Sequence, residues 1–386
     1  LNIAVIGGGA AGFFAAIHAA EAGSRVTIFE KSNKLLSKVR VSGGGRCNVT
    51  NSCADANLLS TFYPRGSKEL RSLFSRFNTT HTHDWFVSRG VPLKAEADGR
   101  VFPVSDRSES IVDCLMQQAV AAGIFIKLNS GIIRFEKNSD GFLLTFQDGR
   151  AATLFDKVIV AAGGFPNPDS YSWLSEMHHT IIKPVPSLFT FNIPDPPFKD
   201  LMGVAVPLVR IKIAGTKLVN EGPMLFTHWG LSGPAVLKLS SLAARELALK
   251  QYQFIALVSF IPESNEHELI QKLNEIKQAS ADKKVLKSPF HQLPSRLWEQ
   301  MCNHLEIDEN KKWGEISKST LNRLAQLLTA CEFSVKGKTT FKEEFVTCGG
   351  IKLSEIDANT MQSKIVPHLF FAGEVMDVDG ITGGFN

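Results

Sequence analysis

Short apolar runs and longer stretches of helical periodicity follow one another along the first half of the chain. Ile3 to Ile6 is too short for a helix and too apolar for a loop, so it predicts a buried strand. Further strands are expected at Arg25 to Phe29 and at Lys157 to Ala162, a continuous apolar run that ends in two glycines. Residues 67–77 and 108–122 carry apolar residues three and four positions apart, which predicts two helices.

Smaller strands are expected between these elements. Asp98 to Arg100 is typical of a hairpin turn that leads into a short strand at 101–104. Residues 125–128, 132–136 and 142–146 predict a small antiparallel group, followed by a turn at Asp148 and Gly149.

A cluster of prolines then interrupts the pattern. The segment from Lys183 through Pro207 contains six prolines, and we expect a domain boundary there. Beyond it the pattern predicts strands at 209–213 and 253–260 and helices at 239–249, 266–277, 295–304 and 318–328. The strand pattern resumes at 341–351 and 369–372. The expected organisation is a first domain in two parts, 1–184 and 341–386, and an insert domain at 185–340 with a helical subdomain at about 264–332.

Three glycines after the first strand carry the clearest chemical signal. Gly7, Gly9 and Gly12 have G-x-G-x-x-G spacing, which in a strand–turn–helix context binds a dinucleotide pyrophosphate at a helix N-terminus. Glu30 ends the second strand, where a carboxylate accepts hydrogen bonds from a ribose diol. We therefore predict an α/β fold with a Rossmann-like dinucleotide-binding domain and a mixed β-rich and helical insert domain.

A second glycine cluster follows the ribose-binding strand. Ser42 to Gly45 offers backbone N–H groups without bulky side chains, and Arg46 and Asn48 add charge and hydrogen-bonding capacity. A flexible loop is the alternative, but the position of this cluster favours a second cofactor clamp.

Composition narrows the class of protein. Hydrophobic residues make up 44% of 386 residues, enough for a large buried core, and no apolar run approaches the length of a membrane span. The net charge of +4 is scattered along the chain, so no nucleic-acid partner is expected.

Six cysteines show neither C-x-x-C nor metal-ligand spacing and predict free thiols in a reducing compartment. Because strand one starts at the N-terminus, we expect no signal peptide and a cytoplasmic protein.

Five blocks together resemble the YhiN-like (BaiN-like) bacterial family of FAD-dependent oxidoreductases, flavoproteins of the two-dinucleotide-binding-domains type. These blocks are GGGAAG (7–12), SGGGRCNVTN (42–51), FTHWGLSGP (226–234), VTCGGI (346–351) and FFAGEVMDVDGITGGFN (370–386). The family pattern continues past Asn386 into a helix, so we expect the natural chain to be longer.

The resemblance implies FAD as cofactor and assigns roles to residues across the chain. It places the pyrophosphate at Gly7 to Gly12, adenine at the Ile132 backbone, the ribitol at Glu374, and the flavin's pyrimidine edge at Thr382 to Gly384. Ala162 stands where the family usually has Thr, which removes one hydroxyl contact. The full set of predicted cofactor-binding residues is Gly7, Gly9, Ala10, Ala11, Gly12, Glu30, Lys31, Ser42, Gly43, Gly44, Arg46, Cys47, Asn48, Ile132, Ala161, Ala162, Gly163, Gly373, Glu374, Asp379, Gly380, Thr382, Gly383 and Gly384.

Two side chains are predicted to take part in catalysis. His228 lies in the Gly- and Pro-rich segment of the insert and is a candidate proton donor, although a lone histidine is more often structural. Arg46 is a candidate for holding an anionic or carbonyl group, although phosphate binding is its favoured use. Cys47 and Cys53 are separated by five residues, where redox-active disulfides of glutathione-reductase-like enzymes have four, so a structural or cofactor-adjacent Cys47 is favoured. No metal site is predicted.

Three functions fit these features. The preferred one is an NAD(P)H-driven reductase of an activated C=C or C=O bond in a small molecule. Because there is a single dinucleotide fingerprint, NADH or NADPH would bind only transiently. The alternatives are an O₂-using amine or ketone oxidase and an FAD-containing RNA-modification or RNA-binding protein, which the scattered charge disfavours. The sequence does not identify the substrate or the oligomeric state.

Overall fold

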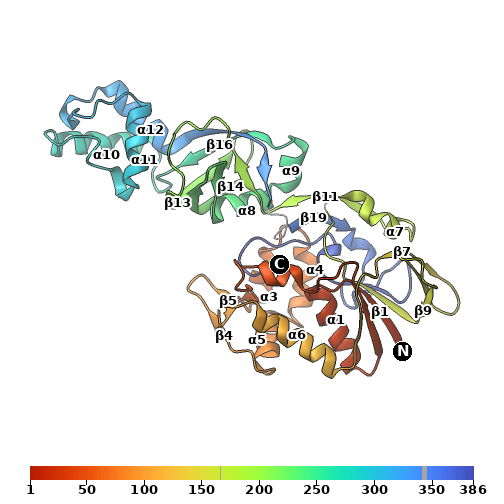
Figure 1. Cartoon of the computed structure of the whole chain (residues 1–386). Helices are drawn as coiled ribbons and strands as arrows, with labels where there is room; N and C mark the ends of the chain where they lie inside the picture. Colours follow the sequence, from red (N-terminus) through yellow and green to blue (C-terminus); the bar gives the residue numbers. More distant parts are fainter. Residues whose placement is uncertain (166, 341–345) are drawn as a thin grey trace. The chain divides into compact units, whose positions relative to one another are not determined.

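The computed structural model describes residues 1–165, 167–340 and 346–386. The chain divides into two compact units, Leu1–Ser187 with Phe341–Asn386 and Leu188–Thr340 (Figure 1). The sequence placed the first boundary between 184 and 185, but strand β11 (Ile181–Ser187) keeps its last residues in the first unit because they pair with β19 (Val346–Ile351). The part of the predicted strand at 341–345 lies outside the described residues.

A five-stranded parallel sheet forms the centre of the first unit, with the order β20-β10-β1-β2-β6. This sheet confirms the predicted Rossmann-like α/β fold. Its strands are β1 (Asn2–Ile6), β2 (Arg25–Phe29), β6 (Phe125–Lys127), β10 (Lys157–Val160) and β20 (Leu369–Phe371).

The expected place of residues 125–128 in an antiparallel group is wrong. β6 pairs in parallel with β2, so that Thr27 lies opposite Phe125. The reason is the preceding helix α6 (Glu109–Ala121), which packs against α1 (Ala10–Glu21) and carries the chain back to the start of a parallel edge strand.

Both faces of the central sheet are covered, which explains why its strands are apolar throughout. Ile3 and Val5 of β1 pack with Phe13 of α1 on one face, while Ala4 and Ile6 face the opposite side. On that side lies an antiparallel sheet of β7 (Ile132–Lys137), β8 (Phe142–Phe146) and β9 (Thr153–Phe155), whose phenylalanines fill the core.

The remaining elements of the first unit are short. The predicted hairpin at 98–100 joins β4 and β5, which pair antiparallel, while β3 pairs with the other side of β5. The bounds are α2 (Ser37–Val41), β3 (Thr50–Asn51), α3 (Ala56–Thr61), α4 (Ser67–Phe74), α5 (Thr79–Val87), β4 (Leu93–Ala95), β5 (Arg100–Pro103) and α7 (Ser172–Ser175), with 3₁₀ turns at Pro168–Tyr171, Leu353–Glu355 and Gly373–Val375.

The second unit combines an antiparallel sheet with a helical part. Its seven strands have the order β17-β16-β13-β14-β15-β12-β18. One face is covered by α8, and α12 packs against both β16 and α10. The helix predicted at 239–249 is divided in two at Ala243, whose backbone leaves helical geometry. The bounds are β12 (Thr190–Asn192), β13 (Ala205–Ile213), β14 (Val219–Phe226), β15 (Gly230–Ser232), α8 (Pro234–Leu242), α9 (Ala244–Leu249), β16 (Gln253–Ser259), α10 (Glu266–Ala279), α11 (Ser295–His304), α12 (Lys318–Ala330), β17 (Cys331–Lys336) and β18 (Lys338–Thr339).

Candidate cofactor site

The turn between β1 and α1 has two glycines that no other residue could replace. The backbone of Gly7 has a φ of +114°, and a Cβ there would lie 2.4 Å from the carbonyl oxygen of Ala161. A Cβ on Gly12 would lie 1.9 Å from the carbonyl oxygen of Gly7. Both contacts are impossible for real atoms, so these glycines let the helix, the turn and the end of β10 pack closely.

Gly9 has the opposite surroundings. It is the N-cap of α1, and a Cβ placed on it would meet no atom within 4 Å. No side chain caps this helix end, and no acidic residue lies in its first turn. A helix N-terminus of this kind, with free N–H groups and open space above a glycine, fits a bound diphosphate.

Glu30 lies beside this turn, directly after β2. Its Oε2 accepts a hydrogen bond from the backbone N of Gly8 at 2.9 Å, and its Oε1 accepts from the backbone N and the Oγ of Ser32 at 2.9 and 2.8 Å. These bonds fix the carboxylate next to the glycine turn. The predicted contact of Glu30 with a ribose stays a prediction.

The structure joins the second glycine cluster to the C-terminal glycines. The Asn51 side chain donates to the carbonyl oxygen of Gly383 at 2.9 Å. In the orientation that satisfies its neighbours, the Asn48 amide accepts from the backbone N of Gly384 at 2.9 Å and donates to the carbonyl of Thr50 at 3.0 Å. A Cβ on Gly384 would lie 2.3 Å from that same Thr50 oxygen, so the approach of the two segments requires glycine.

Glu374 lies in the 3₁₀ turn after β20 and links three segments. Its Oε1 accepts from the backbone N of Thr347 at 2.6 Å, and its Oε2 accepts from the Lys38 ammonium at 2.7 Å and from the backbone N of Gly164 at 3.4 Å. A Cβ on Gly164 would lie 2.4 Å from Thr347 Oγ1, a buried hydroxyl without a partner among the described residues. The carboxylate is therefore held in the turn after β20, beside Gly164 and the start of β19.

Other predicted cofactor residues take different positions. Ile132 begins β7, and the Lys31 ammonium lies 5.3 Å from the centre of the Phe165 ring. The side chain of Asp379 is buried and binds Arg65 and Ser187 of the protein. The structure thus gives the Asp379 carboxylate protein partners where the sequence suggested a cofactor contact.

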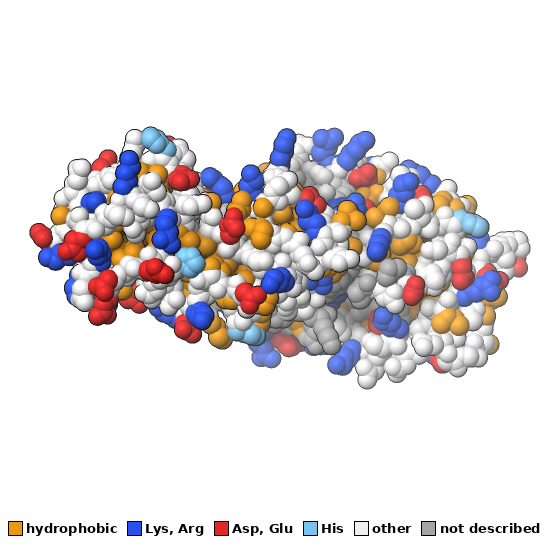
Figure 2. All heavy atoms as spheres, turned by 90° about the horizontal axis from the view of Figure 1, so that it is seen from above, with side chains coloured by type: hydrophobic (Ala, Val, Ile, Leu, Met, Phe, Trp, Pro, Cys, Tyr) orange, Lys and Arg blue, Asp and Glu red, His pale blue; other side chains and the backbone are white. Residues whose placement is uncertain are grey.

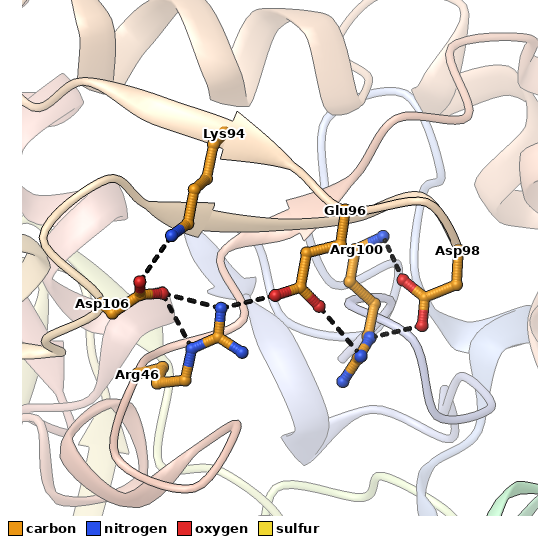
Figure 3. A network of polar contacts seen from close by, with 6 residues as sticks. All are labelled: Arg46, Lys94, Glu96, Asp98, Arg100 and Asp106. Carbon is orange, nitrogen blue, oxygen red and sulfur yellow. Dashed lines mark hydrogen bonds and ion pairs between the residues drawn. The ribbon is translucent and has the colours of Figure 1, made fainter.

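Arg46 belongs to a charged network on the first unit (Figure 3). Its Nε donates to Asp106 at 2.9 Å, its Nη2 contacts Glu96 at 2.5 Å, and its guanidinium carbon lies 3.9 Å from the centre of the Phe102 ring. Lys94, Asp98 and Arg100 extend the network along β4 and β5. The structure assigns Arg46 partners of its own, and its predicted use for an anion stays untested.

We expect Arg46→Met to lower the thermal midpoint while leaving flavin content unchanged, because the substitution leaves Glu96 and Asp106 without their shared cation. Thermal unfolding and the flavin absorbance of the purified variant measure the two effects. Arg107→Met, which removes an exposed arginine that only approaches Glu109 at 3.7 Å, is the control. An unchanged midpoint with lost flavin would instead make Arg46 a cofactor ligand.

The cysteines show no sign of dithiol chemistry. The six cysteines all lie within the described residues and form no disulfide bond, and burial raises the pKa of Cys47 to about 11, an effect that a hydrogen bond with Ser42 only partly opposes. Burial also raises the pKa of Cys53. A thiol with a raised pKa is a poor nucleophile near neutral pH.

Alkylation tests this directly. At pH 8, Cys47 should carry roughly a hundredfold less thiolate than a thiol with the reference pKa of 9.0, and its reaction with iodoacetamide should accelerate as the pH rises toward 11. Mass spectrometry of peptides from the native protein gives the modified fraction at each pH. Fast labelling of Cys47 at pH 7 would contradict the burial argument.

His228 is the predicted site residue that lies in the second unit. It is exposed in the turn between β14 and β15, and its ring contacts Trp229 edge-on at 4.1 Å between centres. Trp229 is itself held by a hydrogen bond from its indole N–H to Thr190 Oγ1 at 3.0 Å. The turn therefore presents an imidazole at a defined position of the second unit.

Sequence reasoning missed several residues that shape the site. Four residues outside the predicted set contact predicted site residues that are distant in the sequence: Lys38, Arg65, Ser187 and Thr347. No local spacing marks them, although Lys38 lies in the basic run after Glu30 and Thr347 in the VTCGGI block.

Within residues 1–165, 167–340 and 346–386, no group of three or more His, Cys, Asp or Glu side chains is arranged to hold a metal ion. Over the same ranges, every helix is too short or too polar to cross a membrane.

Comparisons with known proteins agree with this geometry. The family model described as the HI0933-like protein Rossmann domain matches residues 1–386. The ribosomal RNA dihydrouridine synthase of Escherichia coli K12 is 30% identical, with 99% of this chain and 93% of the relative aligned. The 3-dehydro-bile acid delta(4,6)-reductase of Clostridium scindens is 25% identical over 100% of this chain and 95% of its own length.

A solved structure supports the fold. The 3-ketosteroid-delta4-(5alpha)-dehydrogenase of Rhodococcus jostii RHA1 aligns with a TM-score of 0.52 and 13% identity, covering 100% of this chain and 92% of that one. The predicted resemblance to the YhiN-like family is confirmed by the family model and by the relatives. The chain belongs to the HI0933-like family and is an FAD-dependent oxidoreductase with a Rossmann-type cofactor domain.

Proposed function

We propose that this protein reduces a C=C bond conjugated to a carbonyl group, using FAD and electrons from NADH or NADPH. The observation that carries FAD binding is the open position above Gly9 at the head of α1, between two glycines that admit no side chain, and the relatives' names carry the reaction class. When bound there, FAD supplies a carrier that takes up two electrons from a donor and passes them to an acceptor.

Residues of the first unit would hold this cofactor. The N–H groups at the start of α1 would bind the diphosphate, Glu30 the ribose, and Glu374 hydroxyls of the ribitol chain. The clamp formed by Asn48, Asn51 and the C-terminal glycines would present backbone N–H groups where negative charge gathers on reduction.

The reaction class is supported by what the relatives' names share. A dihydrouridine synthase saturates the C5=C6 bond of uracil, and a delta(4,6)-reductase saturates C=C bonds of a steroid. In both cases a hydride and a proton are added across a C=C bond, and conjugation to a carbonyl makes such a bond an acceptor. Because the first unit has a single glycine fingerprint, which FAD would occupy, NAD(P)H would bind only transiently. Dependence on NAD(P)H as electron donor is the reason to propose that the protein works in the cytoplasm.

Uridine in RNA is the second candidate substrate, beside a small-molecule enone. It is favoured by two relatives named as ribosomal RNA dihydrouridine synthases, 30% and 28% identical and each aligned with 99% of this chain. Against it, basic and acidic side chains are intermixed on the face shown in Figure 2. A basic surface is the usual footprint of an RNA-binding protein.

Anaerobic stopped-flow spectroscopy tests the reaction class. NADH or NADPH should bleach the flavin absorbance, and an enone should restore it much faster than O₂ does. Rapid recovery with O₂ and release of hydrogen peroxide would instead identify an oxidase. Incubation with unmodified ribosomal RNA, followed by mass spectrometry for the gain of two hydrogens in uridine, separates the two substrates.

A further inference from the structure

A largely buried ion pair lies at the base of the C-terminal glycine segment. The side chain of Asp379 has no exposed surface, and that of Arg65 is 10% exposed. Arg65 Nε donates to Asp379 Oδ1 at 2.5 Å, and its Nη2 donates to Oδ2. The hydroxyl of Ser187 donates to the same Oδ2 at 2.7 Å. Both oxygens of the carboxylate are therefore bound by protein groups.

These three residues come from segments with different tasks. Arg65 lies between α3 and α4, and Ser187 is the last residue of the first unit before the chain enters the second. Asp379 directly precedes the segment 380–384, which contains three glycines. Arg65 and Asp379 also form a backbone bridge, so the contact orients the chain as well as the side chains.

The segment that follows Asp379 is anchored to the same stretch as Arg65. The backbone N of Ile381 donates to the carbonyl of Phe62 at 2.9 Å, and the Phe385 ring stacks on the Phe62 ring with 4.4 Å between centres. The Asn386 amide closes the segment through hydrogen bonds with Gly380. A loop rich in glycine has little conformational preference of its own, so these contacts must define its shape.

Burial of the Arg65–Asp379 ion pair has an energetic cost that its contribution to stability does not explain. Taking a carboxylate and a guanidinium out of water is costly, and an apolar pair of similar volume is often equally or more stable. Because desolvating the two charges offsets most of their attraction, the pair adds little to the free energy of unfolding. Its two parallel hydrogen bonds nevertheless fix the orientation of the Arg65 and Asp379 side chains relative to each other. The pair directly precedes segment 380–384, so the fixed orientation of Asp379 helps to define the backbone conformation of that segment.

We propose that Asp379 is a positioning residue, which with Arg65 and Ser187 holds segment 380–384 in the form that binds FAD. Asp379 acts through the loop and does not itself contact the cofactor. This inference rests on the FAD site of the proposed function. Ser187, the last residue of the first unit, and segment 380–384 are then both held by the carboxylate of Asp379.

A pair of variants separates positioning from stability. Asp379→Asn leaves Arg65 buried without its counter-charge and should lower the thermal midpoint of the apoprotein and weaken FAD binding by at least about tenfold. The double variant Arg65→Met/Asp379→Leu removes both charges and should recover the midpoint, while FAD binding stays at least about tenfold weaker than in the wild type. Ser187→Ala, which removes one hydrogen bond, should weaken FAD binding several-fold without unfolding the protein.

The measurements are differential scanning fluorimetry of the apoproteins and titration with FAD, followed by quenching of its fluorescence. Glu21→Gln, which removes the charge from a surface pair with Arg89, is the control and should leave both unchanged. Recovery of FAD affinity together with stability in the double variant, or wild-type affinity in Ser187→Ala, would overturn the positioning role. Neither readout needs an acceptor, so a wild type that binds FAD but fails to reduce an enone refutes the proposed reaction and leaves this inference standing.

Discussion

Gly9→Val should give a folded protein with less than about a tenth of the wild-type flavin. The structure explains why these two properties separate at this position. A Cβ on Gly9 meets no protein atom within 4 Å, and its backbone φ of −91° is open to any residue. A valine there would fill only the space proposed for a diphosphate, at the cost of about 1 kcal/mol for a poorer N-cap. Absorbance at 450 nm per chain measures the loss, and circular dichroism reports the fold.

Gly12→Val is the matched control. Its Cβ would lie 1.9 Å from the Gly7 carbonyl oxygen, so this variant should fail to fold, where Gly9→Val keeps its structure. Gly9→Ala, with a smaller side chain, should retain an intermediate amount of flavin. If Gly9→Val binds FAD as the wild type does, the open space at the head of α1 is not the pyrophosphate site.

His228→Gln has the second largest expected effect. Hydride delivery to a conjugated C=C bond builds negative charge on the acceptor, and a general acid within reach typically contributes ~10² to 10⁴ in rate. Glutamine keeps a hydrogen-bond donor of similar size but cannot release a proton at neutral pH. We expect normal FAD content, normal reduction by NAD(P)H and reoxidation by an enone slowed by about 10² or more, measured as separate half-reactions.

The position of His228 makes this variant easy to interpret. The residue is exposed in a turn, so its replacement should not disturb the core of the second unit. Trp229→Phe, which removes the hydrogen bond to Thr190 but leaves the imidazole, is the control for a change in the shape of the turn. Normal turnover of His228→Gln would transfer the proton donor role to another group or to water.

The central sheet could be predicted because its strands are buried on both faces and therefore appear as continuous apolar runs. Ile3 to Ile6 and Lys157 to Val160 are of this kind, and each is followed directly by glycine or a small residue. The strand at β6 was predicted but its pairing was not, because a three-residue edge strand carries no face pattern and its partner β2 lies about a hundred positions earlier. The break at Ala243 also escaped, since alanine favours a continuous helix.

The candidate site was predictable where a residue type has a local reason to be present. Glycines with positive φ or impossible Cβ contacts belong to this group, as does Glu30 at the end of its strand. Residues whose role depends on a distant partner could not be assigned in this way. Arg65, which contacts the carboxylate of Asp379, and Glu96 and Asp106, which contact Arg46, are such distant partners; the predicted cofactor and anion roles of Asp379 and Arg46 stay predictions.

The most direct test of the account is the stoichiometry of turnover in air. Purified protein with FAD, NADPH or NADH and a conjugated enone should consume one nucleotide for each C=C bond saturated, with almost no hydrogen peroxide. The Gly9→Val protein should consume less than about a tenth as much nucleotide under the same conditions. Nucleotide consumption matched by hydrogen peroxide, without saturated product from either an enone or uridine in RNA, would contradict the proposal that this flavoprotein is a C=C reductase.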